Sequence, residues 1–206
     1  MLISFEGIDG CGKTTQIMLL RERLEKELFP VEVLREPGGT TISEMIRGLL
    51  LNPDVEMNSV TELLLFSAAR SELISSKVKP LLKRNVIVIL DRYYDSTVAY
   101  QGFGRGCLPI AQIHSINAIA SHGLIPNLTF YLDIDLKEAV NRRKNQANDR
   151  MEASGAAFYQ RVIDGFRFLA SKEKRFKQID ATQTPEEIHK ITWNILKKEL
   201  GKKRTV

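Results

Sequence analysis

The chain has 206 residues, 43% of them hydrophobic, and a net charge of +5, which suits one domain with a substantial core. Its two cysteines exclude a disulfide framework and favour a reducing, cytoplasmic setting, and we find neither a signal peptide nor the roughly 20 apolar residues of a membrane span. Basic residues interleaved with exposed aromatic ones are missing, so we expect no nucleic-acid binding.

Short apolar runs alternate with helical patterns along the chain. In the first half we predict, in order, a strand over Leu2–Phe5, a helix over Lys13–Leu28, a strand over Val31–Leu34, helices over Ile42–Leu51 and Thr61–Leu82, and a strand over Val86–Leu90. In the second half we predict a helix over Ile110–Ser121, a strand over Leu128–Leu132, helices from Leu136 and over Phe158–Ala170, a strand over Phe176–Ile179, and a last helix capped by Thr184.

This alternation predicts an α/β fold with a five-stranded parallel sheet flanked by helices, because parallel neighbours need a crossover between them. We expect a single domain over residues 1–206. One stretch interrupts the pattern: residues 142–155, "RRKNQANDRMEASG", are polar and poor in apolar anchors. We interpret this stretch as a lid, with a solvated helix end as the alternative.

The first strand and helix are joined by Gly7-Ile8-Asp9-Gly10-Cys11-Gly12-Lys13-Thr14, which satisfies G-x-x-x-x-G-K-[ST]. The glycines permit a tight loop whose N–H groups bind phosphates together with the helix N-terminus. The lysine is expected to reach the β- and γ-phosphates, and the threonine hydroxyl to ligate Mg²⁺. This predicts a three-layer P-loop NTPase fold, with ATP bound by Gly7, Ile8, Asp9, Gly10, Cys11, Gly12, Lys13, Thr14 and Thr15.

The loop alone does not say what becomes of the γ-phosphate. The N-K-x-D motif with which GTPase switches read the base is missing, and helicases and transport ATPases are typically larger. A chain of this size with a basic lid suits a small-molecule kinase, whose closure excludes water from the transferred group. A nucleotide-dependent binding or switch protein is the alternative from another class.

A second signal is the pair Asp91 and Arg92, which ends the apolar run of the third strand. Ligands of open α/β folds bind at the carboxyl edge of the sheet. A guanidinium there can clamp an anionic acceptor bidentately, and the carboxylate can orient Mg²⁺, its waters or the arginine. We therefore expect an acceptor that carries a phosphate.

The sequence resembles the thymidylate kinase family along nearly its whole length. The residues that carry the resemblance are "FEGIDGCGKTTQ" (5–16), "REPGGT" (35–40), "ELLLFSAAR" (62–70), "DRYYDSTVAYQG" (91–102), "PNLTFYLD" (126–133) and "DRMEA" (149–153). Many enzymes share a P-loop, but the combination of "DRY…S…AYQG" with "LLLFSAAR" is far more specific.

The resemblance implies transfer of the ATP γ-phosphate to dTMP, giving dTDP. Arg92 would hold the dTMP phosphate, Phe66 would stack on thymine, and Arg70 would donate to a thymine carbonyl. Tyr100 would crowd the sugar 2′ position. By residue type alone, Phe66 suits a core position and Arg70 a solvated helix face. The full implied substrate-binding set is Asp9, Arg35, Phe66, Arg70, Arg92, Ser96, Tyr100 and Gln101.

The family supplies its catalytic arginine in one of two ways. The eukaryotic type carries it in the P-loop, where this chain has Gly10, and the bacterial type carries it in the lid. We expect this chain to be of the lid type. Our hypothesis is that Arg150, together with Arg143, closes over the transferring phosphoryl group and offsets its charge. The implied catalytic set is Lys13, Asp9, Asp91, Arg92, Arg143 and Arg150, and the implied Mg²⁺ ligands are Thr14 and Asp91.

The resemblance also implies a homodimer, with Leu63–Phe66 and the helix from Ile110 as candidate contacts. The alternative within enzymes is another nucleoside monophosphate kinase, acting on dUMP, CMP or AMP. The base pocket around Phe66, Arg70 and Gln101 would distinguish the two.

Overall fold

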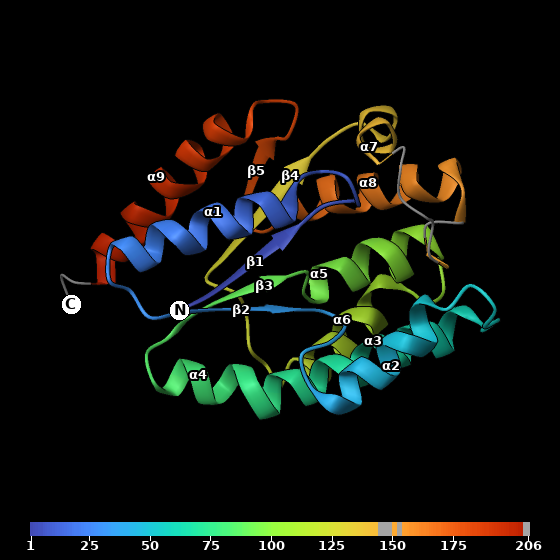
Figure 1. The fold of residues 1–206 in the computed structure, drawn as a ribbon. Coiled ribbons are helices and arrows are strands. Elements are labelled where there is room, and N and C mark those ends of the chain that lie inside the picture. Colours follow the sequence, from blue (N-terminus) through green and yellow to red (C-terminus); the bar gives the residue numbers. More distant parts are fainter. Residues whose placement is uncertain (144–149, 152–153, 204–206) are drawn as a thin grey trace.

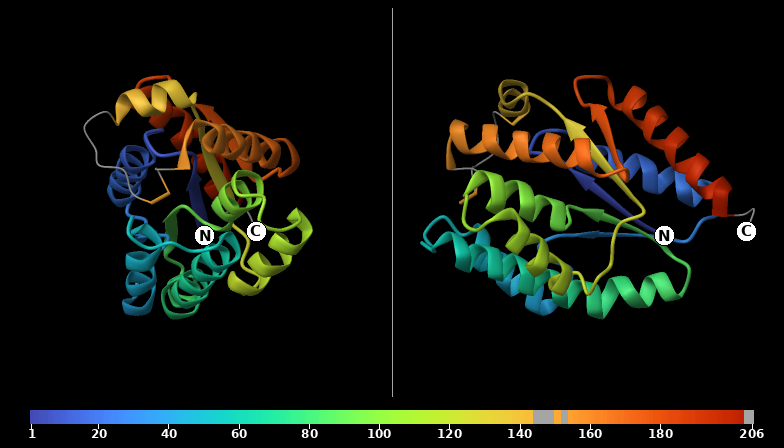
Figure 2. Two further views of the ribbon diagram at one scale, coloured as in Figure 1. Left: turned by 90° about the vertical axis from the view of Figure 1, so that its right-hand side faces the viewer. Right: turned by 180° about the vertical axis from the view of Figure 1, so that it is seen from behind.

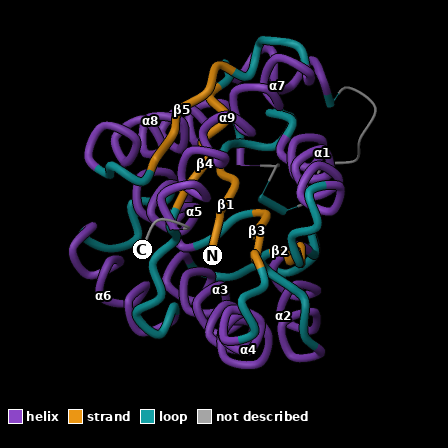
Figure 3. The backbone as a smooth tube through the Cα atoms, turned by 90° about the vertical axis from the view of Figure 1, so that its left-hand side faces the viewer, coloured by secondary structure: helices purple, strands orange, loops and turns teal. Residues whose placement is uncertain are grey.

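The computed structural model describes residues 1–143, 150–151 and 154–203. One parallel sheet lies at its centre, with the strand order β2-β3-β1-β4-β5, as Figure 3 shows from the side of the two chain ends. The strands are β1 (Leu2–Glu6), β2 (Val31–Arg35), β3 (Ile87–Asp91), β4 (Leu128–Asp133) and β5 (Phe176–Asp180). The predicted five-stranded parallel sheet is confirmed.

Helices connect the strands. They are α1 (Lys13–Lys26), α2 (Thr41–Leu51), α3 (Ser59–Leu73), α4 (Lys79–Lys83), α5 (Tyr94–Thr97), α6 (Ile110–Ala120), α7 (Leu136–Arg142), α8 (Ala156–Lys172) and α9 (Pro185–Lys203). Two π-helical segments, η1 (Ile74–Val78) and η2 (Val98–Gly104), continue α3 and α5. No helix in the described part of the chain is long and apolar enough to cross a membrane.

The helices form two layers around the sheet (Figures 1 and 2). Helices α1 and α9 pack against each other over one face, while α4, α5, α6 and α8 cover the other. The main core lies between these layers and is built from side chains with no exposed surface, such as Phe5, Phe130 and Phe166. The strands run towards the right in Figure 1, so their carboxyl ends meet at one edge.

Every strand runs one residue further at its carboxyl end than its apolar pattern predicts. The backbone ladder continues through the first polar residue, because ladder hydrogen bonds do not depend on the side chain. The five additional residues are Glu6, Arg35, Asp91, Asp133 and Asp180. Their side chains are therefore carried by rigid strand backbone at the carboxyl edge of the sheet.

The predicted helices are confirmed with small shifts at their ends, and two segments differ. The single helix expected over Thr61–Leu82 is α3, η1 and α4 in succession. Residues 94–104, for which we predict no element, are helical in α5 and η2. Tertiary packing stabilises this segment: it lies against α8 so closely that a Cβ on Gly104 would stand 2.6 Å from a ring carbon of Phe158.

The predicted capping box of α9 is confirmed. The backbone N–H of Glu187 donates to the Thr184 hydroxyl at 3.3 Å, and the Glu187 carboxylate accepts from the Thr184 N–H at 3.0 Å. These reciprocal bonds satisfy donors that the first turn of a helix leaves without partners. Most of the predicted lid, namely residues 144–149 and 152–153, lies outside the described residues.

Candidate active site

The P-loop follows β1 and leads into α1, as predicted. Gly12 caps the helix in the left-handed region at φ 94°, which a side chain would strain. The Lys13 ammonium is buried and lies back over the loop, donating at 3.1 Å to each of the carbonyl oxygens of Gly7 and Ile8. The loop therefore places a cation beside the start of a helix, a combination that binds anions.

Arg92 reaches the same loop from the end of β3. Its Nη1 donates to the Gly7 carbonyl at 2.8 Å, and its Nη2 donates to Asp9 Oδ1 at 2.6 Å. Burial alone would raise the pKa of Asp9, but the charges of Arg92 and Lys13 hold it well below its ordinary value. Asp9 is therefore a carboxylate throughout the neutral range, and it anchors one side of the guanidinium.

Arg92 itself lies in the left-handed region at φ 70°, which is unfavourable for a side chain with a Cβ. Two hydrogen bonds hold this turn: Arg92 N–H donates to the Phe5 carbonyl at 3.0 Å, and Tyr93 N–H donates to Glu6 Oε1 at 2.8 Å. The other oxygen of Glu6 accepts from the Ser96 hydroxyl at 2.6 Å. The fully buried Glu6 thus fixes the turn that presents Arg92.

Two hollows meet at this turn. The inner cavity lies between the turn and α3 and is lined by Asp9, Phe66, Arg70, Arg92, Ser96, Tyr100 and Gln101, with other residues. The P-loop cleft runs along the loop and is lined by Asp9–Gln16, Arg35, Asp91, Arg142 and Arg143, with other residues. Four residues belong to both: Asp9, Glu36, Arg47 and Arg92.

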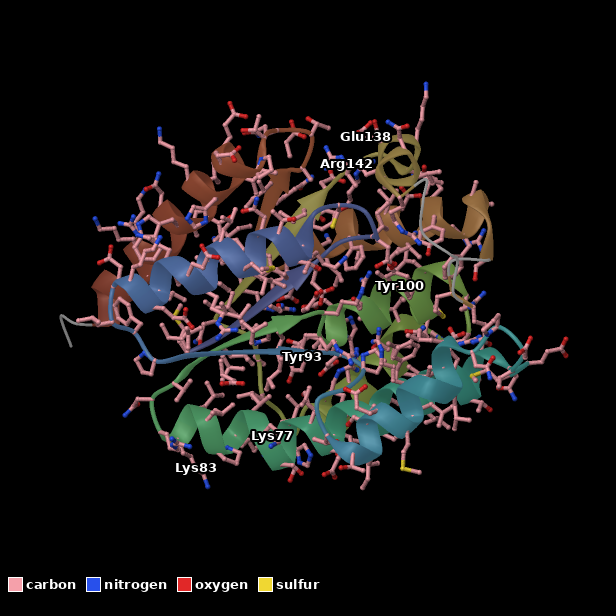
Figure 4. The ribbon with its side chains drawn as sticks, in the orientation of Figure 1. Lys77, Lys83, Tyr93, Tyr100, Glu138 and Arg142 are labelled. Carbon is pink, nitrogen blue, oxygen red and sulfur yellow. The ribbon has the colours of Figure 1, made fainter. Side chains whose placement is uncertain are left out.

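The structure thus brings the predicted substrate residues together, with one exception. Arg35 lines the P-loop cleft and not the inner cavity, and its guanidinium pairs with Glu44 at 3.0 Å. Tyr100 lies beneath the Arg92 guanidinium, 5.1 Å from it, and its hydroxyl is buried without a hydrogen-bond partner in the described part of the chain. Figure 4 shows Tyr93 and Tyr100 in the middle of the molecule, whereas Glu138 and Arg142 lie on α7 at its edge.

A buried ion pair forms the floor of the inner cavity. Arg70 Nε donates to Glu36 Oε2 at 2.7 Å, and its Nη1 donates to Asn117 Oδ1 at 3.3 Å. The other carboxylate oxygen of Glu36 is buried and accepts no hydrogen bond within the described residues. These bonds hold Arg70 in one orientation. The second carboxylate oxygen of Glu36, Oε1, is available for a hydrogen bond with a ligand.

Burial raises the pKa of Glu36 to about 7, although the Arg70 guanidinium opposes the shift. Between its ordinary value, 4.5, and about 7, the folded protein keeps a proton that the unfolded chain has lost, so the free energy of unfolding falls as the pH rises. We expect Glu36→Gln to remove the part of the fall that comes from Glu36, on the order of a few kcal/mol, and to leave the part from Glu6, whose pKa burial raises to about 8. Urea unfolding at several pH values measures the free energy of unfolding of both proteins. If this free energy depends on pH in the same way in wild type and variant, the raised pKa of Glu36 is contradicted.

Of the two arginines proposed from the lid, Arg143 lies at the P-loop. A Cβ on Gly10 would stand 2.4 Å from the Ala139 carbonyl oxygen and 3.1 Å from Arg143 Cδ. Gly10 also lies in the left-handed region at φ 87°. No arginine fits at position 10 in this arrangement, and Arg143 lines the P-loop cleft beside it. This geometry agrees with the lid-arginine type.

Arg150 lies elsewhere in this structure. Its Nη1 pairs with Glu62 at 2.7 Å, and its Nε donates to the Leu50 carbonyl at 2.7 Å. Glu62 also accepts from Gln101 Nε2 at 2.9 Å and from Arg105 Nε at 3.2 Å. The catalytic role suggested for Arg150 thus stays a prediction, because this arrangement holds the side chain at a buried carboxylate and not at the P-loop.

Oxygen donors for a divalent cation are present in the P-loop cleft. The exposed Thr14 hydroxyl and the Asp91 carboxylate both line it, and Mg²⁺ prefers oxygen ligands completed by water and substrate phosphates. Among the described residues, no group of three or more His, Cys, Asp or Glu side chains forms a site of its own. The donor set therefore fits a cation that binds together with a nucleotide.

Sequence reasoning missed three functional candidates: Glu6, Glu62 and Arg47. Glu6 and Glu62 are at most 1% exposed, yet the partners that bury them lie 39 to 90 positions away in the chain. Arg47 donates to the Pro37 carbonyl at 3.0 Å and lines both hollows. A signal was available for Glu6, which ends an apolar strand just as Asp91 does.

Known proteins resemble this chain over almost all of its length. The thymidylate kinase family profile matches residues 5–191. The thymidylate kinase of Prosthecochloris aestuarii is 48% identical over 208 residues, which cover 95% of this chain and 93% of that protein. That of Caldanaerobacter subterraneus is 43% identical, with coverages of 92% and 91%. The crystal structure of thymidylate kinase from Ehrlichia chaffeensis has a TM-score of 0.76 at 37% identity, covering 95% of this chain and 98% of that one.

Proposed function

The chain belongs to the thymidylate kinase family, whose reaction phosphorylates dTMP to dTDP, and we propose that its two hollows divide this reaction between them. ATP lies along the P-loop cleft, and dTMP fills the inner cavity. The observation that carries the proposal is their shared wall, where Arg92 touches both Gly7 and Asp9. An acceptor phosphate held by Arg92 is thereby next to the loop that holds the donor phosphates.

On the donor side, backbone N–H groups of the P-loop and the N-terminus of α1 bind the ATP phosphates. Lys13 leaves its two backbone carbonyl partners for the β- and γ-phosphates, which offer stronger, charged acceptors. Thr14 and Asp91 would hold Mg²⁺, which when bound neutralises phosphate charge. The lysine and the cation ligands thus come from two neighbouring strand ends.

On the acceptor side, Arg92 clamps the dTMP phosphate. A guanidinium has five N–H donors. Arg92 forms three hydrogen bonds, to Gly7, Asp9 and Ser96, so donors remain for a phosphate. Phe66 stacks on the thymine and Arg70 donates to its O4. The Tyr100 ring occupies the space that a ribose 2′-hydroxyl would need.

The chemical step needs no general base from the protein. The dTMP phosphate is largely a dianion at neutral pH, so one of its oxygens attacks the γ-phosphorus directly while the bond to the β-phosphate oxygen breaks. ADP leaves with the electron pair, and the new phosphoanhydride is dTDP. Catalysis then rests on positioning and on the positive charges of Lys13, Arg92 and Arg143, which meet the charge that develops.

We propose further that the protein acts as a cytoplasmic homodimer. Support comes from apolar side chains on the neighbouring helices α3 and α6, where Leu64 is 52% exposed and Ile119 is 77% exposed. Of the candidate contacts in Leu63–Phe66, Leu63 is fully buried in the core, Leu65 and Phe66 are half-buried, and Leu64 is exposed.

The function is tested by ADP release from Mg·ATP with a panel of acceptors: dTMP, its ribose analogue, dUMP, CMP, AMP and none. We expect strong preference for dTMP, including over the ribose analogue because of Tyr100. Similar turnover of all pyrimidines would keep a kinase but refute the thymine pocket. ADP release that no acceptor changes would refute the kinase itself and favour a nucleotide switch.

A further inference from the structure

The buried carboxylate of Glu62 has no role in the reaction described above, although it is bonded to Gln101, which lines the inner cavity. Glu62 is 1% exposed and accepts from Gln101, Arg105 and Arg150. Burial alone would raise its pKa, but these donors, led by the amide of Gln101, lower it below the ordinary value. The side chain is therefore ionised at neutral pH and offers hydrogen-bond acceptors only.

An acceptor-only neighbour decides which way the Gln101 amide faces. With Gln101 Nε2 at 2.9 Å from Glu62 Oε1, the reversed amide would place two oxygen atoms against each other without a proton between them. The side-chain oxygen of Gln101, Oε1, forms no hydrogen bond to other described residues, and Gln101 lines the inner cavity. The amide thus has a fixed donor end at Glu62 and an unused acceptor end.

The complementary donor nearby is Arg70, which the Glu36 and Asn117 bonds hold in place. A base in the inner cavity therefore meets a donor from Arg70 and an acceptor from Gln101. Thymine and uracil match this pair, because they present a carbonyl at C4 and an N–H at N3. Cytosine presents an amino group at C4 and a bare nitrogen at N3, so it opposes both.

We propose that Glu62 is a positioning residue for base selection: by fixing the Gln101 amide with its carbonyl towards the base, it makes the enzyme select 4-keto over 4-amino pyrimidines. This inference rests on the proposed function and adds a residue that does not touch the substrate. It also explains why a carboxylate, and not an amide, stands at position 62, since an amide there would permit Gln101 to reverse.

The test is the ratio of kcat/KM for dTMP to that for dCMP in wild type and in Glu62→Gln. The amide introduced by this substitution can donate to a reversed Gln101, whose NH₂ would then meet cytosine N3. We expect the ratio to fall by about tenfold, through a lower value for dTMP and a higher value for dCMP, as the change of one hydrogen bond requires. The ratio of dTMP to dUMP should stay within about twofold, because both bases carry N3–H.

Arg105→Met is the matched control, since it removes another partner of Glu62 and leaves the bond to Gln101. Its dTMP-to-dCMP ratio should equal that of wild type. If Glu62→Gln does not fold, as judged by circular dichroism, Gln101→Met replaces it: this variant leaves Glu62 and both arginines in place, and its ratio must fall as well.

A ratio that stays within twofold of wild type in the folded Glu62→Gln variant, or equal losses for dTMP and dCMP, would overturn the proposal and leave Glu62 a structural residue. In the Gln101→Met variant, equal losses for both substrates would overturn it too. A wild-type enzyme that does not phosphorylate dTMP would instead refute the proposed function, so the two failures are distinguishable.

Discussion

Replacing Arg92 with methionine should lower kcat/KM for dTMP by roughly a thousandfold, because the proposed clamp on the acceptor phosphate is lost. The substitution also removes the ion-pair partner of Asp9, whose carboxylate the Arg92 guanidinium keeps ionised. Arg92→Lys keeps the charge but not the planar fork, and we expect it to lose about ten- to a hundredfold. Steady-state kinetics with varied dTMP at saturating Mg·ATP measure both variants.

Arg23→Met serves as the control for Arg92, since Arg23 lies on α1, is 46% exposed, and contacts Glu27 at the end of that helix and the Trp193 ring, away from the residues that line the two hollows. Its kinetic constants should equal those of wild type. An Arg92→Met enzyme within about tenfold of wild-type kcat/KM would show that other groups hold the acceptor phosphate.

The second large effect is expected at Arg143. Its removal by Arg143→Ala should lower kcat by roughly a hundred- to a thousandfold, since an arginine that meets the transferring phosphoryl group offsets charge in the transition state. Single-turnover assays of dTDP formation measure the chemical step directly. The ATP affinity should change much less than kcat.

Arg142 provides a matched control one position away. It also lines the P-loop cleft, but its guanidinium pairs with Glu138 at 2.9 Å on the same helix. We expect Arg142→Ala to keep kcat within about threefold of wild type. Arg150→Ala belongs in the same series: if it alone abolishes turnover and Arg143→Ala does not, the catalytic arginine is Arg150, and it must leave Glu62 to act.

The site was predictable from the sequence wherever its residues are close together in the chain. The P-loop is one contiguous motif with a strand before it and a helix after it, and Asp91 and Arg92 stand out as charges at the end of an apolar run. The carboxyl edge of a parallel sheet then brings these separate signals to one place. Local pattern and general topology were sufficient for this much.

What was missed depends on contacts between distant segments. Glu62 looks like an ordinary polar residue near the start of a helix, and only the fold shows that Gln101, Arg105 and Arg150 surround it. The helical segment over residues 94–104 contains glycine or β-branched residues at positions 97, 98, 102 and 104, which weaken helix propensity. Packing against α8 outweighs that preference, and packing is not visible in a local pattern.

The wall shared by the two hollows has a thermodynamic consequence. Arg92 and Asp9 line both hollows, so a nucleotide bound in either one changes the surroundings that a nucleotide in the other meets. Any factor by which dTMP alters the affinity for ATP must equal the factor by which ATP alters the affinity for dTMP. Mutations of Arg92 or Asp9 therefore change this coupling factor as well as each affinity, so the shared wall sets how strongly the two substrates influence each other's binding.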